Sequence, residues 1–299
     1  MLIHRKVVRR LFWSLSAAAV FVALCQLFFQ PRNPWLRVNS ALFRAQAAAG
    51  YLVGVLYASR MRNEYPEGSG MRRAWGWMIA GVVSFLAYQT LDTLMVLCPF
   101  LRSVPTEDAW LIGVTLSLAL VLLGLFQMWW TFRDAGFSPE LSRSSWAVVG
   151  IVAALTIARM AHGLEPHHLD ASLLFRSIRG TSPLLVGAGT AVGFLLYRMT
   201  AGFGEGKFSR TIRGLLLFFA VHLLLFQLDW YPSLWNVPVI DAATDVLYYV
   251  LPWVLACALT ECWEVGIEAK LAVEHYQIGE YRHQWGPAAT SCSPENYLS

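Results

Sequence analysis

Charged residues are scarce in this sequence of 299 residues: only 14% are Asp, Glu, Lys or Arg, whereas 57% are hydrophobic. A soluble globular domain usually has about 25% charged residues. The shortage therefore argues against a soluble protein. The net charge of +4 comes from short basic groups beside apolar blocks. Such groups indicate orientation in a membrane, so we expect the lipid bilayer, and no nucleic acid, as a partner.

The motifs of common enzymes are also missing. The sequence has no G-x-S-x-G, no P-loop and no H-E-x-x-H, which are the usual marks of a nucleophile, a phosphate site or a zinc protease. Its five cysteines are scattered singly, so they predict no C-x-x-C pair and no disulfide framework. Catalysis has no positive support in the sequence, and no motif identifies a cofactor.

Apolar residues instead occur in blocks of about 20, the length that a helix needs to cross a hydrocarbon core of roughly 30 Å. The sequence predicts an all-α fold, a polytopic transmembrane bundle over residues 1–263. The eight expected spans are 11–29, 41–58, 74–97, 109–132, 146–162, 183–199, 215–230 and 239–263. Apolar residues before the sixth span predict a short helix lying on the membrane surface. We expect a cytoplasmic amphipathic helix over residues 264–285 and a disordered tail over residues 286–299.

The loops between these spans differ in their basic residues. Counted on alternating sides of the membrane, Lys and Arg outside the spans number 16 on the side of the N-terminus and 5 on the other side. Cytoplasmic loops have the excess of basic residues in membrane proteins. Eight spans therefore predict a multi-pass protein of the bacterial inner membrane with both termini in the cytoplasm.

Polar side chains within the spans are concentrated at one depth, in the outer half of the membrane. Ionisable groups at such a depth are costly and face other helices or water. Arg44 and Arg159 could neutralise two of the aspartates by bidentate hydrogen bonds. The predicted ligand-binding residues are Arg44, Asp92, Arg159, His162, His222, Asp229, Asp241 and Asp245.

The last span combines acidic residues with a proline. Asp241, Asp245, Tyr248 and Pro252 fall at helical spacing and share one face. That face should point at other helices, and small residues elsewhere would let helices approach closely. Two pairs spaced four apart, Gly50 with Gly54 and Gly189 with Gly193, predict such close packing.

Four interpretations of the polar residues remain open. They could hold helices together, move ions or protons, or serve a redox or metal role. They could also line a ligand pocket open to the outside, with aromatic walls from Trp110, Tyr248 and Tyr249. We expect a sensor-like or accessory binding protein without catalysis. The alternative is a subunit of a membrane transport or electron-transfer complex.

A metal site has one candidate motif. His162, His167, His168 and Asp170 surround the end of the fifth span, and imidazole with carboxylate suits zinc, copper or iron. Their spacing matches no fixed ligand template, and a solvated loop with three histidines explains it more simply. The sequence therefore leaves the presence of a metal or haem unknown.

The last span resembles a known kind of membrane protein. Its pattern D-x3-D-x-L-Y-Y-V-L-P-W-V-L-A closes a set of about eight helices, and it is similar to the membrane sensor regions of bacterial sensor histidine kinases. In those proteins the last span continues into a signalling helix. No kinase module follows here, so the resemblance implies a stand-alone sensor or an accessory subunit. The C-terminal helix would then meet a membrane or cytoplasmic protein partner.

Overall fold

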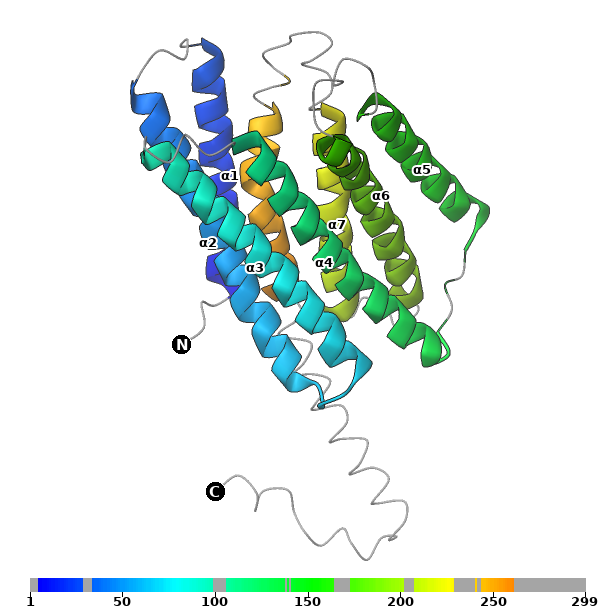
Figure 1. Cartoon of the computed structure of the whole chain (residues 1–299). Coiled ribbons are helices and arrows are strands. Elements are labelled where there is room, and N and C mark those ends of the chain that lie inside the picture. Colours follow the sequence, from blue (N-terminus) through cyan, green and yellow to red (C-terminus); the bar gives the residue numbers. More distant parts are fainter. Residues whose placement is uncertain are drawn as a thin grey trace, which may run out of the picture.

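The computed structural model describes residues 5–28, 34–98, 106–137, 139, 141–163, 173–201, 207–228, 240 and 243–260. Every regular element among these residues is an α-helix, and none of them lies in a β-strand. The helices run up and down beside one another as a bundle (Figure 1). The all-α class expected from the composition is therefore confirmed.

Eight helices make up the described part of the chain. They follow the predicted apolar blocks in order, and several extend beyond them because helical hydrogen bonding continues past the apolar stretch. The last helix is named the C-terminal helix below. The bounds are α1 (Arg5–Phe28), α2 (Pro34–Glu64), α3 (Gly70–Leu97), α4 (Thr106–Asp134), α5 (Arg143–Gly163), α6 (Leu173–Ala201), α7 (Lys207–Leu228) and the C-terminal helix (Ala243–Thr260).

Six helical stretches in the described part are long and apolar enough to cross a membrane. Each contains at least 18 residues, which span about 27 Å at 1.5 Å per residue. Neither α1 nor α2 is among the six. The six stretches are Gly70–Leu97, Ile112–Asp134, Arg143–Ala161, Gly180–Thr200, Ser209–Leu228 and Ala243–Thr260.

The prediction was wrong at the start of α6. The sequence predicted a surface helix followed by a separate span from Pro183, but α6 is one continuous helix that contains Pro183. Apolar residues before Pro183 keep a helical spacing, so no signal ends the helix there. A transmembrane helix tolerates proline where a neighbour helps to satisfy the backbone. Beside it, Ser182 Oγ lies 2.5 Å from Thr115 Oγ1 of α4, which ties α6 to its neighbour at this point.

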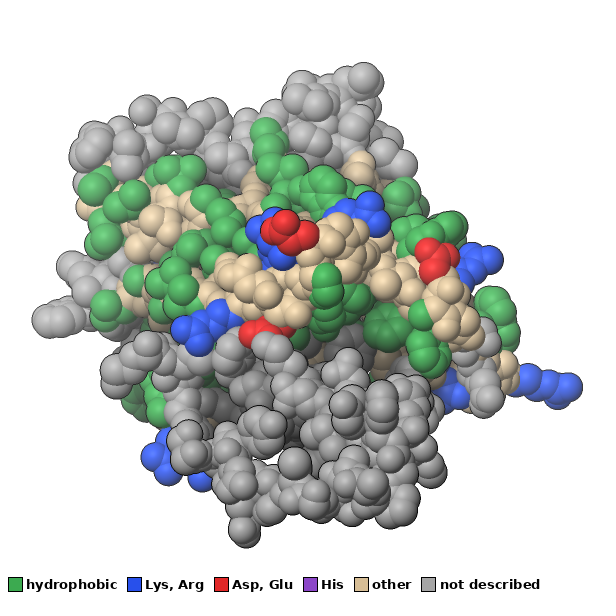
Figure 2. Space-filling view, turned by 90° about the horizontal axis from the view of Figure 1, so that it is seen from below, with side chains coloured by type: hydrophobic (Ala, Val, Ile, Leu, Met, Phe, Trp, Pro, Cys, Tyr) green, Lys and Arg blue, Asp and Glu red, His purple; other side chains and the backbone are tan. Residues whose placement is uncertain are grey.

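The basic residues gather at one end of the bundle. At this end α2 ends and α3 begins, and α4 also ends there (Figure 1). The turn into α3 is well defined, because Gly68 has a φ of 79° and Ser69 Oγ accepts a hydrogen bond from the Arg72 N–H at 3.2 Å. Figure 2 views this end, where more Lys and Arg side chains appear than Asp and Glu.

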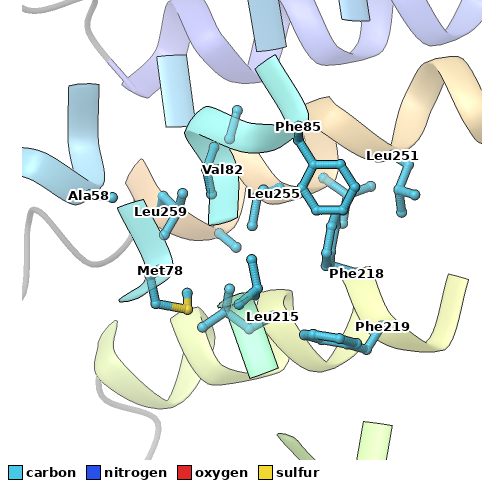
Figure 3. Close-up of a cluster of buried hydrophobic side chains, with 14 of the residues drawn as sticks. Ala58, Met78, Val82, Phe85, Leu215, Phe218, Phe219, Leu251, Leu255 and Leu259 are labelled. Carbon is cyan, nitrogen blue, oxygen red and sulfur yellow. The ribbon is translucent and has the colours of Figure 1, made fainter. Parts of the chain in front are cut away.

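The hydrophobic core is built mainly from α2, α3, α4, α7 and the C-terminal helix, and Figure 3 shows a part of it. α3 packs between α2 and α4, while α6 packs on α4, α5 and α7. The C-terminal helix therefore belongs to the centre of the protein. The labelled core residues are Ala58, Met78, Val82, Phe85, Leu215, Phe218, Phe219, Leu251, Leu255 and Leu259.

Glycine brings α2 against the C-terminal helix. A Cβ at Gly50 would lie 2.9 Å from Pro252 Cβ and 3.1 Å from the Pro252 carbonyl carbon, which is closer than real contacts allow. One turn later, a Cβ at Gly54 would lie 3.3 Å from a methyl group of Leu259. Gly189 of α6 faces the Phe219 ring of α7 in the same way. Close packing is thus confirmed at Gly50, Gly54 and Gly189, whereas a Cβ at Gly193 would make only ordinary contacts with Leu216, from 3.4 Å.

Candidate functional site

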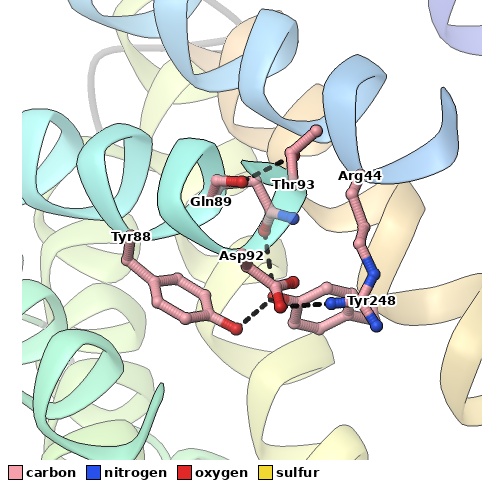
Figure 4. A network of polar contacts seen from close by, with 6 residues as sticks. All are labelled: Arg44, Tyr88, Gln89, Asp92, Thr93 and Tyr248. Carbon is pink, nitrogen blue, oxygen red and sulfur yellow. Dashed lines mark hydrogen bonds and ion pairs between the residues drawn. The ribbon is translucent and has the colours of Figure 1, made fainter. Parts of the chain in front are cut away.

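A group of polar side chains joins α2, α3 and the C-terminal helix (Figure 4). Tyr248 of the C-terminal helix has its hydroxyl 2.9 Å from Gln89 Oε1 and 3.1 Å from the Tyr88 hydroxyl. A phenol has one hydrogen, so the Tyr248 hydroxyl can donate to only one of these two oxygens at a time. Gln89 and Tyr88 are adjacent on α3, so Tyr248 contacts two neighbouring side chains of one helix.

An ion pair lies next to these tyrosines. The Arg44 guanidinium of α2 donates a hydrogen bond to the Asp92 carboxylate of α3, and their side chains are 28% and 15% exposed. Asp92 follows Tyr88 by one helical turn, so both residues face the same neighbours. Figure 4 shows Arg44, Asp92, Tyr88 and Tyr248 converging on one region. The predicted pairing of Arg44 with one of the aspartates is confirmed here.

A partly open cavity with a volume of about 70 Å³ lies beside the polar group. Pockets for drug-sized ligands occupy roughly 300 to 1,000 Å³, so this cavity has room only for part of a small ligand, whose remainder would extend through its open side. Its lining comes from α2, α3, α4, α7 and the C-terminal helix and is mainly aromatic and apolar. The lining residues are Tyr51, Phe85, Tyr88, Val114, His222, Leu225, Phe226, Thr244, Tyr248 and Leu251.

His222 is held in one orientation at the cavity wall. Its Nδ1 lies 3.3 Å from the Phe218 carbonyl oxygen of the preceding turn. A carbonyl only accepts hydrogen bonds, so Nδ1 has the proton and Nε2 is left with its lone pair. The Phe218 ring meets the imidazole edge-on, with centroids 4.6 Å apart, and the Phe85 ring lies 5.9 Å away.

Two amide side chains near this region are incompletely hydrogen-bonded. Gln89 is 1% exposed, and its Nε2 has no hydrogen-bond partner among the described residues, although its Oε1 faces Tyr248. The buried Nε2 and Oε1 atoms of Gln46 on α2 likewise have no partner within the described part of the chain. Buried amides without partners cost about 1–3 kcal/mol each, so native structures rarely retain them without a reason such as an ordered water or a ligand.

A second set of polar contacts links α5 to α7, and one of them ends on the backbone of Phe226, a lining residue of the cavity. Arg159 donates from Nε to the Phe226 carbonyl at 2.8 Å, and Gln227 donates from Nε2 to the Leu155 carbonyl at 3.1 Å. The two bonds run in opposite directions between the helices. They are the firmest attachment of α5 to α7, because α5 otherwise packs mainly on α6.

The structure places some of the predicted ligand-binding residues together and separates others. Arg44 and Asp92 are paired beside the cavity, and His222 lines it. Arg159 instead joins α5 to α7. Asp245 is exposed on the C-terminal helix.

Several other predictions cannot be placed in this way. His162 belongs to α5, but its side chain lies outside the described part, as does the side chain of Trp110. Tyr248 forms part of the cavity wall as expected, whereas Tyr249 packs against Phe43 with centroids 5.5 Å apart. The remaining predicted residues lie outside the described residues and are Asp229, Asp241, His167, His168 and Asp170.

The sequence prediction missed most of the cavity wall. Tyr51, Phe85, Val114 and Thr244 were not singled out, because single aromatic or apolar residues in a hydrophobic helix give no signal of their own. α4 lines the cavity through Val114, and none of the lining residues comes from α5, which was expected to contribute. The useful signal was the spacing of Tyr88 and Asp92 on one face of α3.

Chemically, the cavity wall combines a few hydrogen-bonding groups with large apolar side chains. Among the described residues, no group of three or more His, Cys, Asp and Glu could hold a metal ion. The candidate motif around His167 lies outside the part that was searched. The described cavity wall offers hydroxyl groups, one imidazole and large apolar surfaces, which are the features of a site for a small organic molecule.

The apolar helices define the class of this protein as an integral, multi-pass α-helical membrane protein. Comparison with protein-family models, curated proteins and solved structures finds no match for the chain. Its function must therefore be argued from the helices and the cavity themselves.

Proposed function

We propose that this protein binds a small molecule in the cavity between α2, α3, α4, α7 and the C-terminal helix, in a sensor-like or accessory role without catalysis. The observation that supports this most strongly is the position of Tyr248, which both lines the cavity and contacts Gln89 and Tyr88. An occupant that touches Tyr248 would change contacts between α3 and the C-terminal helix. Binding would thereby alter how the last helix sits in the bundle.

We further propose eight spans in the bacterial inner membrane, with both termini in the cytoplasm. The 16-to-5 distribution of basic residues supports this orientation. The ends of α2 and α4 lie together at the basic end of the bundle, as alternating spans require (Figure 1). In this orientation the Arg44–Asp92 pair lies in the outer half of the membrane, so the cavity would receive its ligand from the periplasmic side or from the outer leaflet.

The proposed output follows from the resemblance to sensor regions of histidine kinases. In such regions the last span leads into a signalling helix, and here the C-terminal helix is one of the helices that line the cavity. Residues 264–285 would transmit its movement to a membrane or cytoplasmic protein partner. The close contact of Gly50 with Pro252 supports such coupling, because a shift of one helix must displace the other.

The experiment that tests binding compares two matched variants of α4. Val114→Phe fills the cavity, since Val114 is 5% exposed and lines it. Ile112→Phe is the control, because Ile112 is 45% exposed on the outside of the same helix. A ligand present at about 100 times its Kd stabilises a protein by about 2.7 kcal/mol. We expect compounds from a small-molecule library to raise the Tm of the wild type and Ile112→Phe, and to leave Val114→Phe unchanged.

The same library should alter cleavage of residues 264–285 by protease in membrane vesicles, if binding moves the C-terminal helix. If every compound that raises the Tm of the wild type raises the Tm of Val114→Phe equally, the proposed site is contradicted. If compounds stabilise the wild type but not Val114→Phe, and yet cleavage of residues 264–285 does not change, the binding site is supported and the sensor-like role is refuted.

One observation favours the alternative, a subunit of a transport or electron-transfer complex. Only 17% of the apolar stretch of α5 is buried, so this helix offers a long apolar face to lipid or to another subunit. Copurification of a second membrane protein, together with haem or pigment absorbance, would support this alternative. The purified protein alone, colourless and monodisperse, would argue against it.

A further inference from the structure

Two polar atoms in the cavity wall have no role in the contacts described so far. His222 Nε2 is an acceptor, because Nδ1 holds the proton for the Phe218 carbonyl, and Nε2 has no hydrogen bond to a described residue. The Tyr51 hydroxyl also lacks a hydrogen bond to any described residue. Both side chains line the same cavity, and their exposed fractions are only 7% and 5%.

Aromatic contacts fix both of these side chains. The Tyr51 ring is stacked on Phe85, with centroids 5.0 Å apart and planes inclined by 3°. The imidazole of His222 contacts the Phe85 and Phe218 rings, which also contact each other with centroids 6.1 Å apart. A site whose polar atoms are already oriented loses little side-chain entropy when a ligand binds. The two atoms therefore form a prepared pair of hydrogen-bonding positions on an aromatic wall.

The cavity wall excludes a charged occupant. None of its described lining residues is Asp, Glu, Lys or Arg, and Val114, Leu225, Phe226 and Leu251 cover much of it. The nearby Arg44 and Asp92 neutralise each other. Burying a net charge against such a wall would be strongly unfavourable, whereas a neutral ring would pack on its aromatic side chains.

We infer that the cavity accepts a neutral aromatic molecule with a hydroxyl or N–H group, which donates a hydrogen bond to His222 Nε2 while its ring packs among Tyr51, Phe85 and Phe226. The inference rests on the proposed binding function and specifies its ligand class. An acceptor-only molecule, such as an aryl ether, leaves Nε2 without a partner. The Tyr51 hydroxyl can serve an oxygen of the ligand as donor, so it adds affinity without deciding between the two classes.

The test uses two probes that differ only at the donor. 2-Naphthol has a hydroxyl group, and 2-methoxynaphthalene has the same ring with the hydrogen replaced by methyl. Equilibrium dialysis at neutral pH into nanodiscs containing the full chain, with empty nanodiscs of the same lipid as background, gives both affinities. We expect 2-naphthol to bind at least fivefold more tightly, the equivalent of one net hydrogen bond.

Variants on α7 assign the preference to one atom. His222→Phe retains a ring of similar shape and removes Nε2, so the ratio of the two affinities should fall to about one. Leu224→Phe is the control, because Leu224 is 47% exposed on the same helix, and the ratio should stay at its wild-type value. If His222→Phe fails to assemble, Tyr51→Phe provides a second variant: it should weaken 2-naphthol about fivefold and keep a preference for the donor.

Three outcomes separate this inference from the function on which it rests. A preference for 2-naphthol that disappears in His222→Phe supports the ligand class. Equal binding of both probes, or a preference for 2-naphthol that persists in His222→Phe, overturns the ligand class. If the binding of both probes is lost in Val114→Phe, the cavity is still supported as a binding site. If neither probe binds above the Val114→Phe level, the ligand class is refuted, and the library screen then decides separately whether the cavity binds anything.

Discussion

The contact between Gly50 and Pro252 allows a prediction whose sign is informative. Replacing a helical glycine by alanine stabilises a helix by about 1 kcal/mol when the new methyl group has room. At Gly50 it has none, because the methyl carbon would lie 2.9 Å from Pro252 Cβ and 3.1 Å from the Pro252 carbonyl carbon. Ordinary carbon contacts are about 3.5–4.0 Å, so the two helices must separate by about half an ångström or more.

Gly150 on α5 gives the matched control. It is also inside a helix, but a Cβ there would have no atom within 4 Å. The gain in helix propensity is common to Gly50→Ala and Gly150→Ala, so their difference isolates the cost of overpacking, about 1–3 kcal/mol. We expect Gly150→Ala to be neutral or up to about 1 kcal/mol more stable than the wild type. Gly50→Ala should be about 1–3 kcal/mol less stable than Gly150→Ala, which is the cost of overpacking.

Reversible unfolding in mixed micelles, with helix loss followed by circular dichroism, measures both variants against the wild type. Gly50→Ala should also weaken binding in the cavity, because Tyr248 lies one turn before Pro252 on the displaced helix. Equal stability of the two variants, or a Gly50→Ala protein more stable than the wild type, would show that α2 and the C-terminal helix do not meet as described.

Three further predictions concern the polar contacts. Asp92→Asn should lower the free energy of unfolding by about 1–3 kcal/mol, which is less than for a fully buried pair because Arg44 and Asp92 are partly exposed. A double-mutant cycle with Arg44→Gln, measured by the same unfolding assay, should show a coupling energy of at least about 0.5 kcal/mol. Tyr248→Phe should cost about 1–3 kcal/mol, since it leaves Gln89 without its partner. A cost no greater than that of Phe43→Leu, which alters only the neighbouring contact with Tyr249, would contradict this hydrogen bond. Arg159→Met should speed hydrogen exchange in α5 alone, and unchanged exchange there would show that its bond to the Phe226 carbonyl does not hold the helix.

The helices could be predicted from the sequence because a bilayer demands long apolar stretches, and such stretches are visible without knowledge of the fold. Gly50 and Gly189 were also predictable as close contacts, since small residues at helical spacing have few other uses in a membrane. The start of α6 was not predictable in this way. Pro183 reads as a boundary in a soluble protein, whereas here the helix continues through it.

The site was predictable only in part, because helical spacing gives the face of a residue and not its neighbour. Asp92 could be assigned a basic partner, and Arg44 provides it. Which helix would meet Tyr88 depended on the arrangement of eight helices, so its contact with Tyr248 had no signal in the sequence. The same limit applies to Arg159, whose hydrogen bond to the Phe226 carbonyl of α7 had no signal in the sequence.

Pro252 has a consequence for the mechanics of the last helix. Proline has no N–H, so the helical hydrogen bond that would connect it to the residue four positions earlier, Tyr248, cannot form. The stretch that faces the cavity is thus joined to the following stretch by a weakened turn, seated against the bare backbone of Gly50. A helix with one weakened turn can tilt on one side of that turn while the other side stays packed in the core. In this protein the weakened turn comes directly after Tyr248, the side chain that a bound molecule would displace.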